Sequence, residues 1–313
     1  MCFRRRAALK ASFQTVTEQI QSLEADGVIA DHHTAEILHR IGEYVIVDRY
    51  GAFFLTPLAS KKTGRRIFEP YTTFQDIYHL YLFDRALRQL MFEFFAIAEA
   101  SLKSVSCYQF CRMSRTRHDA YLDESYYNPL ESSVHVERLI EDFRAILGHH
   151  SRKNQPAKDY IRQYRSAHGD VPLRVIMPAL TLGQTFKFYC FQNESVRNSI
   201  AREFAELYRQ SYGSHLRLSP RRLRLAFDHI KDFRNICAHG EQLYCARISP
   251  SRDVTISRAF SDLKLVLSKH DFSRLQDHFA DLLYQAASQF DRPHFAKLLI
   301  SMGFHRYDPR RKA

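Results

Sequence analysis

Arg234 and His239, five positions apart, carry the side chains that RNA hydrolysis without a metal requires. That reaction needs a base for the ribose 2′-hydroxyl, an acid for the leaving 5′-oxygen and a cation beside the phosphorane. Histidine serves as base or acid because its pKa lies near neutrality. Arginine serves as the cation because its planar group stays charged and matches phosphate. Residues 234–239 are therefore a candidate ribonuclease motif.

The spacing alone does not identify such a motif, because the chain is rich in both residue types. It has 34 Arg and 16 His, and chance predicts roughly five pairs separated by five to seven positions. Similar pairs join Arg112 to His118, Arg144 to His149 or His150, Arg162 to His168, and Arg222 or Arg224 to His229. They lie in polar segments or in the middle of a helix pattern, where a solvated face is the simpler interpretation.

Local context distinguishes residues 234–239 from the other pairs. They end a helix pattern that begins at Ser219 and Pro220, a typical cap and first turn, and that stops at Gly240. A helix C-terminus stabilises a protonated imidazole, which favours proton donation. A capping histidine beside a surface arginine remains the alternative interpretation.

The charge of the chain indicates the class of partner. Lys and Arg outnumber Asp and Glu by 46 to 34, which gives a net charge of +12. Such an excess favours a polyanion, either nucleic acid or an acidic membrane surface, although solubility alone also explains it. No run of about 18 apolar residues occurs, and no apolar core follows the basic start, so we expect neither a membrane span nor a signal peptide.

The cysteines do not indicate a metal or redox site. The six stand at positions 2, 107, 111, 190, 237 and 245, and no two have the C-x-x-C spacing. A zinc ribbon and a thioredoxin-like site are therefore not supported, and no metal or other cofactor is expected. Free thiols in a reducing cytoplasm are the simpler expectation.

Helix patterns cover most of the chain. Apolar residues at steps of three and four predict helices at 14–26, 32–41, 133–147, 157–167, 195–211, 219–240 and 272–290. The strongest pattern starts at Phe74, continues to Val105 and predicts a core helix on the order of 50 Å long. Residues 172–190 should be kinked or split by Pro178 and Gly183.

One stretch has the composition of a strand. Residues 43–56 are β-branched and aromatic, and residues 57–70 look like an exposed connection. The sequence as a whole predicts an all-α fold, a helical bundle with a small N-terminal helical appendage. We expect 1–70 to form the appendage and connection, and 71–313 to form the main helical domain.

Several motifs recur in known proteins. Residues 234–239 read Arg-Asn-x-x-Ala-His, which resembles the signature of HEPN domains. Further matches are Gln19, Ile20, Leu23, Gly27, Ala35 and Leu38, then Ile77, Tyr78, Leu80, Tyr81, Phe83, Asp84, Arg85, Leu87 and Arg88, and finally Met302, Gly303 and Phe304. Over most of its length the chain thus resembles the Abi-like (AbiD/AbiF) abortive-infection family, although it lacks the Trp that this family commonly carries.

The resemblance implies a HEPN-like helical bundle in which Arg234 and His239 are catalytic and no cofactor takes part. HEPN ribonucleases generally act as homodimers in which these residues meet, and their cleavage leaves a 2′,3′-cyclic phosphate. In Abi-like systems the infected cell is arrested, and some relatives are paired with a structured noncoding RNA, as in a toxin–antitoxin system. The implied protein is a cytoplasmic antiphage ribonuclease with RNA as its substrate and partner.

The resemblance also suggests supporting residues. Asn235 belongs to the signature, and Glu99 with Lys103 matches a family motif that would orient Arg234 or contact phosphate. A surface ion pair four positions apart is the alternative for Glu99 and Lys103. Candidate RNA contacts are Arg221, Arg222, Arg224 and Tyr244. For these residues, a solvated face and side-chain packing are the alternatives.

Two other functions fit the sequence. A non-catalytic RNA-binding component of a defence ribonucleoprotein would share every feature and differ only in the absence of turnover. A DNA-binding regulator would use the helices at 14–41, but their mixed charge gives little support and no recognition helix stands out.

Overall fold

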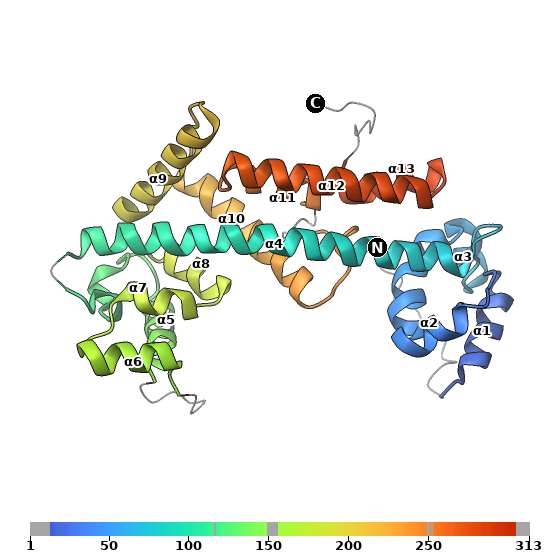
Figure 1. The fold of residues 1–313 in the computed structure, drawn as a ribbon, viewed down its shortest axis with the longest axis horizontal. Helices are drawn as coiled ribbons and strands as arrows, with labels where there is room; N and C mark the ends of the chain where they lie inside the picture. The colour runs from blue at the N-terminus through green and yellow to red at the C-terminus, as the bar shows by residue number, and fades with distance from the viewer. Residues whose placement is uncertain (1–12, 116, 149–155, 249–250, 252, 305–313) are drawn as a thin grey trace. The chain divides into compact units, whose positions relative to one another are not determined.

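The computed structural model describes residues 13–115, 117–148, 156–248, 251 and 253–304. These residues form helices joined by turns and isolated bridges, and contain no named strand. Figure 1 shows the arrangement. The expected all-α class is confirmed.

The described chain divides into two compact units. The first holds residues 13–88 and 280–301, and the second holds 89–279 and 302–304. Three helices contribute residues to both units, α4 (Phe74–Met113), α12 (Lys269–Gln289) and α13 (Arg292–Met302). The expected division into 1–70 and 71–313 concerns an appendage and a family domain, and it remains a prediction.

The first unit consists of short helices and the beginning of α4. Besides that part of α4 and the end of α12 it contains α1 (Val16–Ala25), α2 (Thr34–Ile41), η1 (Tyr44–Asp48), η2 (Gly51–Phe54), α3 (Pro57–Thr63) and α13 (Arg292–Met302), the last up to residue 301. Thr15 caps α1, because its Oγ1 accepts a hydrogen bond from the amide of Glu18 at 3.3 Å. Phe13, which the sequence pattern places on the apolar side, is 90% exposed because the helix begins only after it.

Residues 43–56 form helical turns and not the strand that their composition favours. The buried side chains of this stretch are Ile46, Val47, Tyr50, Phe53 and Phe54. Their steps of one, three and four residues are those of a helix face, whereas a strand buries every second residue. The expectation was wrong because β-branched and aromatic residues also suit a fully buried helical turn, where packing overrides propensity.

A buried polar triad supports the first unit. The hydroxyl of Tyr50 donates to Asp84 Oδ2 at 2.7 Å and accepts from Arg88 NH1 at 3.0 Å, and Asp84 and Arg88 form an ion pair. Burial and the neighbouring Asp84 carboxylate raise the pKa of Tyr50 well above its ordinary value. The triad thus keeps a neutral phenol between two buried charges.

Replacing Tyr50 by Phe should lower the free energy of unfolding by about 1–2 kcal/mol, because the buried carboxylate loses a donor. Urea unfolding measures the change. Tyr81→Phe is the control, since the Tyr81 ring packs edge-on against Tyr50 at 5.7 Å but its hydroxyl is outside the triad. Equal losses in the two variants would contradict a specific role for the triad.

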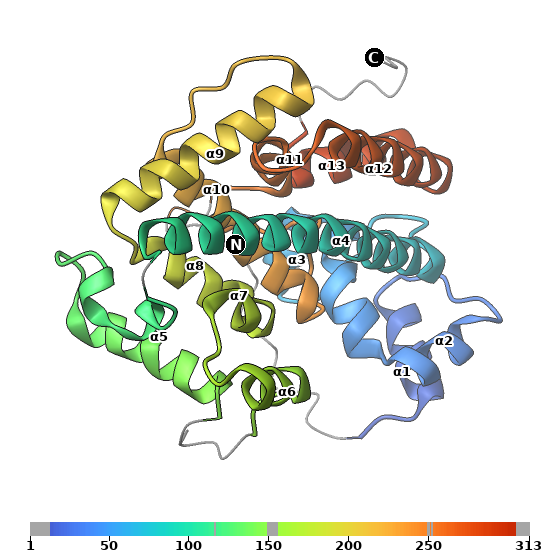
Figure 2. The same ribbon diagram turned by 60° about the vertical axis from the view of Figure 1, so that its left-hand side comes forward.

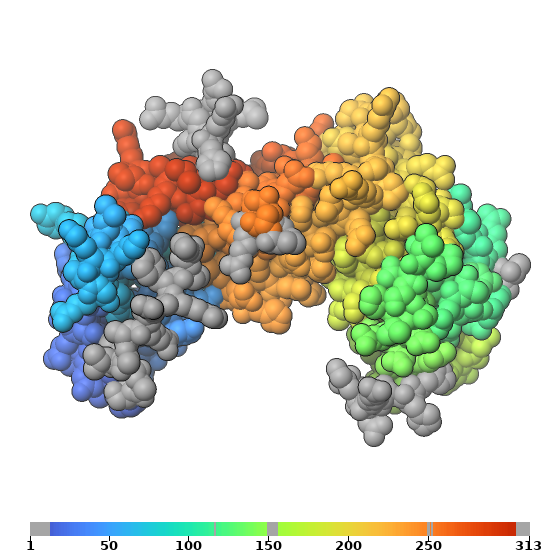
Figure 3. All heavy atoms as spheres, turned by 180° about the vertical axis from the view of Figure 1, so that it is seen from behind, coloured from blue at the N-terminus to red at the C-terminus, as the bar shows by residue number. Residues whose placement is uncertain are grey.

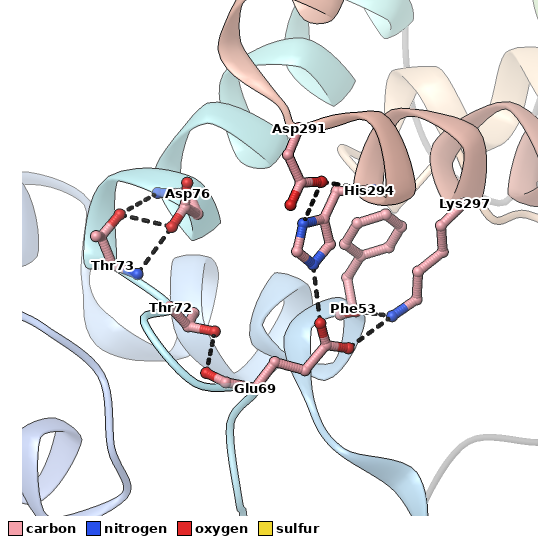
Figure 4. A network of polar contacts seen from close by, with 8 residues as sticks. All are labelled: Phe53, Glu69, Thr72, Thr73, Asp76, Asp291, His294 and Lys297. Atoms are coloured by element: carbon pink, nitrogen blue, oxygen red, sulfur yellow. Dashed lines mark hydrogen bonds and ion pairs between the residues drawn. The ribbon is translucent and has the colours of Figure 1, made fainter.

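A second polar network joins α13 to the connection before α4 within the first unit (Figure 4). Glu69 Oε2 lies 3.0 Å from His294 Nε2, and His294 Nδ1 lies 2.8 Å from Asp291 Oδ1. Lys297 donates to the carbonyl oxygen of Phe53 and lies 3.4 Å from Glu69 Oε1. Charged residues thereby connect parts of the chain that are more than 200 positions apart.

Helix α4 is longer than its apolar pattern indicates. Its 40 residues span about 60 Å at 1.5 Å per residue. The start agrees with the prediction, because Thr73 and Asp76 form a capping box: Thr73 Oγ1 accepts from the Asp76 amide at 3.1 Å, and Asp76 Oδ2 accepts from the Thr73 amide at 2.8 Å.

The second unit is a helical assembly. Besides the rest of α4 and the beginning of α12 it contains η3 (Ala120–Leu122), η4 (Glu124–Tyr126), α5 (Ser133–Ile146), α6 (Asp159–His168), α7 (Leu173–Ile176), η5 (Met177–Ala179), α8 (Leu182–Cys190), α9 (Glu194–Tyr212), α10 (Pro220–Ala238) and α11 (Ile256–Lys264). The expected split of 172–190 occurs at Leu180 and Thr181, whose extended backbone separates η5 from α8. Pro178 lies within η5, and Gly183 lies in the first turn of α8. Helices α11 and α13 were not predicted, and neither was α3, which lies in residues 57–70, the expected connection.

Helix α10 lies against α8, α9 and α11 (Figure 2). The segment around its C-terminal end, in orange in Figure 3, lies on the surface of the second unit. Among the helices of the described residues, none is long and apolar enough to cross a membrane.

Candidate active site

Helix α10 positions the candidate motif. At its start, Ser219 Oγ accepts a hydrogen bond from the Arg222 amide at 3.2 Å, and Pro220 occupies the first turn. Its buried face consists of Leu223, Ala226, Phe227, Ile230 and Phe233. Because this face ends in a fully buried Phe233, the backbone of the next residue, Arg234, is fixed by packing.

His239 ends the helix as its C-cap residue. Its backbone has left the helical conformation (φ −90°, ψ 4°), and its amide donates to the carbonyl oxygen of Asn235 at 2.9 Å. The side chain is exposed, and its imidazole makes no hydrogen bond or ion pair with any other described residue. Gly240 then turns the chain with a φ of +64°. An imidazole at this position is accessible for proton transfer.

Arg234 is held by two residues of α4. Its NH2 lies 3.6 Å from Glu99 Oε2, and its guanidinium lies over the ring of Phe92 at 5.7 Å from the centroid. The side chain is 27% exposed. An ion pair on one side and an aromatic face on another restrict the guanidinium, while its remaining edge is open to a ligand.

Glu99 joins Arg234 to Lys103. The Lys103 Nζ lies 2.7 Å from Glu99 Oε1, and the side chains of Lys103 and Glu99 are only 17% and 13% exposed. The pair is therefore more than a solvated surface pair, because its carboxylate also contacts the arginine of the motif. Two cations and one carboxylate leave this cluster with a formal charge of +1, which suits an anionic ligand.

Asn235 is exposed and contributes little to this geometry. Its Oδ1 lies 3.5 Å from Arg234 NH1, at the limit of a hydrogen bond. Sequence reasoning did not find Phe92. The available signal was its position two helical turns before Glu99, since residues seven apart share a helix face.

A family match covers the region that carries this site. The model of the family described as Abi-like protein matches residues 36–245, about two thirds of the chain. The chain belongs to the Abi-like family. Membership places it among proteins of abortive infection, a form of defence. No curated protein and no solved structure matches the chain.

The candidate RNA contacts of the Abi-like protein differ in their surroundings. Arg221 and Arg224 are exposed and form no ion pair with other described residues. Arg222 NH2 lies 3.0 Å from Asp262 Oδ1, so its charge is partly engaged. Tyr244 is only 5% exposed, which favours the packing interpretation. Arg221 and Arg224 are therefore the candidate arginines that no ion pair with a described residue engages.

The described cysteines of the Abi-like protein form no disulfide with one another. The described residues contain no group of three or more His, Cys, Asp or Glu side chains placed to hold a metal ion. Cys111 is exposed and lies one helical turn after the buried Cys107 on α4. A hydrogen bond from Cys107, with the charge of Arg174, lowers the pKa of Cys111 to about 7.

Cys111 should therefore react faster than the buried Cys107 and the half-buried Cys190 near neutral pH, because the thiolate is the nucleophile. Its alkylation by iodoacetamide, followed by mass spectrometry from pH 6 to 9, should be half-maximal near pH 7. Cys190, whose pKa burial raises to about 11, is the unreactive control. Cys107→Ala should slow Cys111 at pH 7. Equal rates for Cys111 and Cys190 would contradict the prediction.

Proposed function

We propose that this Abi-like protein is a metal-independent HEPN endoribonuclease in which Arg234 and His239 are the catalytic residues. The observation that carries the proposal is the pairing of a restrained, partly open guanidinium with an exposed imidazole at the end of one packed helix. The restraint on Arg234 by Glu99 and Phe92 prepares it for the charge of a phosphorane before substrate arrives.

The roles follow from the chemistry of each group. His239 transfers a proton, as base for the 2′-hydroxyl or as acid for the leaving 5′-oxygen. Arg234 stabilises the charge that develops on the phosphorane oxygens. Attack by the 2′-oxygen breaks the bond from phosphorus to the 5′-oxygen and leaves a 2′,3′-cyclic phosphate. Because each motif has one histidine, a homodimer would supply both a base and an acid.

The charge of the chain suits the same proposal. A net charge of +12 favours a polyanion such as RNA as substrate. A structured noncoding RNA as a controlling partner is what the resemblance to Abi-like systems suggests. The biological outcome would be arrest of an infected cell through RNA cleavage. This is how an endoribonuclease would perform the defence role that the family indicates.

Incubating the purified protein with labelled single-stranded RNA in excess EDTA tests the proposal. We expect cleavage with 2′,3′-cyclic phosphate ends, which mass spectrometry of the fragments identifies. A stable complex without turnover would support the non-catalytic ribonucleoprotein component instead. Cleavage that EDTA abolishes and Mg²⁺ restores would overturn the mechanism.

A further inference from the structure

Helices α10 and α11 meet around a buried carboxylate that the candidate active site does not use. Asp262 is 0% exposed. Its Oδ2 lies 2.7 Å from His229 Nδ1, and its Oδ1 lies 3.0 Å from Arg222 NH2 and 3.4 Å from Arg258 Nε. Arg222 and His229 stand two turns apart on α10, and Arg258 stands one turn before Asp262 on α11. All four residues belong to the second unit.

The charges in this cluster do not balance. Burial of a carboxylate requires a cationic or hydrogen-bonding partner, and one arginine with the histidine would provide it. The second arginine is in excess, so the cluster has a charge of +1 with a neutral imidazole and +2 with a protonated one. Among the described residues, no carboxylate other than Asp262 pairs with Arg222, His229 or Arg258.

The arginines of the cluster also keep unused donors. Each guanidinium has five N–H groups, and both arginines approach the same oxygen, Asp262 Oδ1. Asp262 Oδ1 accepts no well-directed hydrogen bond, so the nearby N–H groups do not aim at it. The side chains of Arg222 and Arg258 are 31% and 44% exposed, and that of His229 is 14% exposed. The cationic groups thus reach solvent while the carboxylate that orients them stays buried.

Helix ends add to the positive potential. Arg222 is the third residue of α10, and Arg258 is the third residue of α11. First-turn amides carry the positive end of the helix dipole, which attracts anions near these side chains. Glu99 is used in a similar way in the candidate active site, where it holds Arg234 and Lys103 together.

We propose that Arg222, His229 and Arg258 form a second oxyanion site, separate from Arg234 and His239, that binds a phosphate group. Its ligand is a phosphodiester of bound RNA. Along α10, His229 and Arg234 are about 7.5 Å apart at 1.5 Å per residue, within reach of one RNA strand. The phosphate chemistry follows from the cluster, and the choice of RNA as its source rests on the proposed function. Asp262 acts as a positioning residue.

The test uses the full chain with the His239→Ala substitution, so that binding is measured without cleavage. Fluorescence anisotropy with labelled single-stranded RNA gives the affinity over a range of salt concentrations. Arg258→Gln should weaken binding roughly fivefold and reduce the slope of log affinity against log salt by about one. Arg274→Gln is the matched control, because Arg274 is 40% exposed but is paired with Glu93 and Asp271.

A second measurement separates the sources of phosphate. Inorganic phosphate should raise the melting temperature of the parent protein more than chloride at equal ionic strength, and Arg258→Gln should remove that difference. Arg222 and His229 still cover Asp262 in this variant, so it should fold.

A phosphate effect without any change in RNA affinity would overturn RNA as the ligand and assign the site to a free phosphate compound. If Arg258→Gln and Arg274→Gln behave alike in both assays, the cluster only joins two helices and the proposal fails. Loss of cleavage in the parent sequence with both binding effects intact would refute only the proposed function.

Discussion

Replacing His239 or Arg234 by alanine should lower the rate of RNA cleavage by at least about a hundredfold and leave the fold intact. The exposed imidazole of His239 has no partner among the described residues, so its removal disturbs no contact of the fold. Arg234 contributes one ion pair and one aromatic contact at the surface. Single-turnover cleavage measures the loss, and thermal unfolding checks that each variant is folded.

The same chain offers matched controls for these substitutions. Arg202→Ala removes an exposed arginine from α9, and His278→Ala removes an exposed histidine from α12. Neither should change the rate of bond cleavage beyond a few fold. Glu99→Gln should give an intermediate loss, roughly ten- to a hundredfold, because it releases Arg234 from its orientation without removing it. Alanine variants of His239 and Arg234 that cleave at the parent rate would exclude the proposed mechanism.

Helix α4 shows that the family resemblance identified the fold but did not by itself locate the candidate site. Residues 77–88 give its best match, but the structure places them in the core of the first unit, where Asp84 and Arg88 pair with Tyr50. A motif of this kind identifies a family through its fold. The residue of this helix that contacts the proposed catalytic Arg234 is Glu99, 11 positions beyond Arg88.

Helix boundaries were predictable where a side chain satisfies the first free amides. Ser219 before α10 and Thr73 before α4 are such residues, and both helices begin where their caps indicate. A capping hydrogen bond joins residues only three positions apart, so a short stretch of sequence is enough to predict it. The ends of the helices were less certain, because continuation of α4 to Met113 depends on packing against distant segments.

The side-chain contacts between helices were not predictable from residue spacing, because they join residues that are distant in the sequence. The carboxylate of Asp262 meets His229 across 33 positions, and the contact of Arg234 with Glu99 was expected only from the family resemblance. Residue spacing within one segment contains no information about such pairs. Helix α11 was missed for a related reason, since its nine residues are too few to establish a period.

The C-terminal Met-Gly-Phe segment is where a single methyl group should have a large effect on stability. Gly303 has a φ of +88°, and a Cβ added there would lie 2.1 Å from Thr255 Oγ1 and 2.6 Å from Ser257 Oγ. Rotation of Thr255 would move its hydroxyl but not its own Cβ, which would lie 3.0 Å away. Gly303→Ala should therefore lower the free energy of unfolding by about 3 kcal/mol or more. Urea unfolding measures this loss.

The variant Gly213→Ala separates the cost of the left-handed backbone from the cost of the close contact with Thr255 and Ser257. Gly213 also has a left-handed backbone, with φ of +68°, but an added Cβ there would meet no atom within 4 Å. Its alanine variant should lose only about 1–2 kcal/mol, the cost of the left-handed conformation. The excess loss at Gly303 then measures the close approach that lets Phe304 pack against Phe260 and Phe279. Equal losses at both glycines would show that backbone conformation alone, and not this contact, requires glycine at position 303.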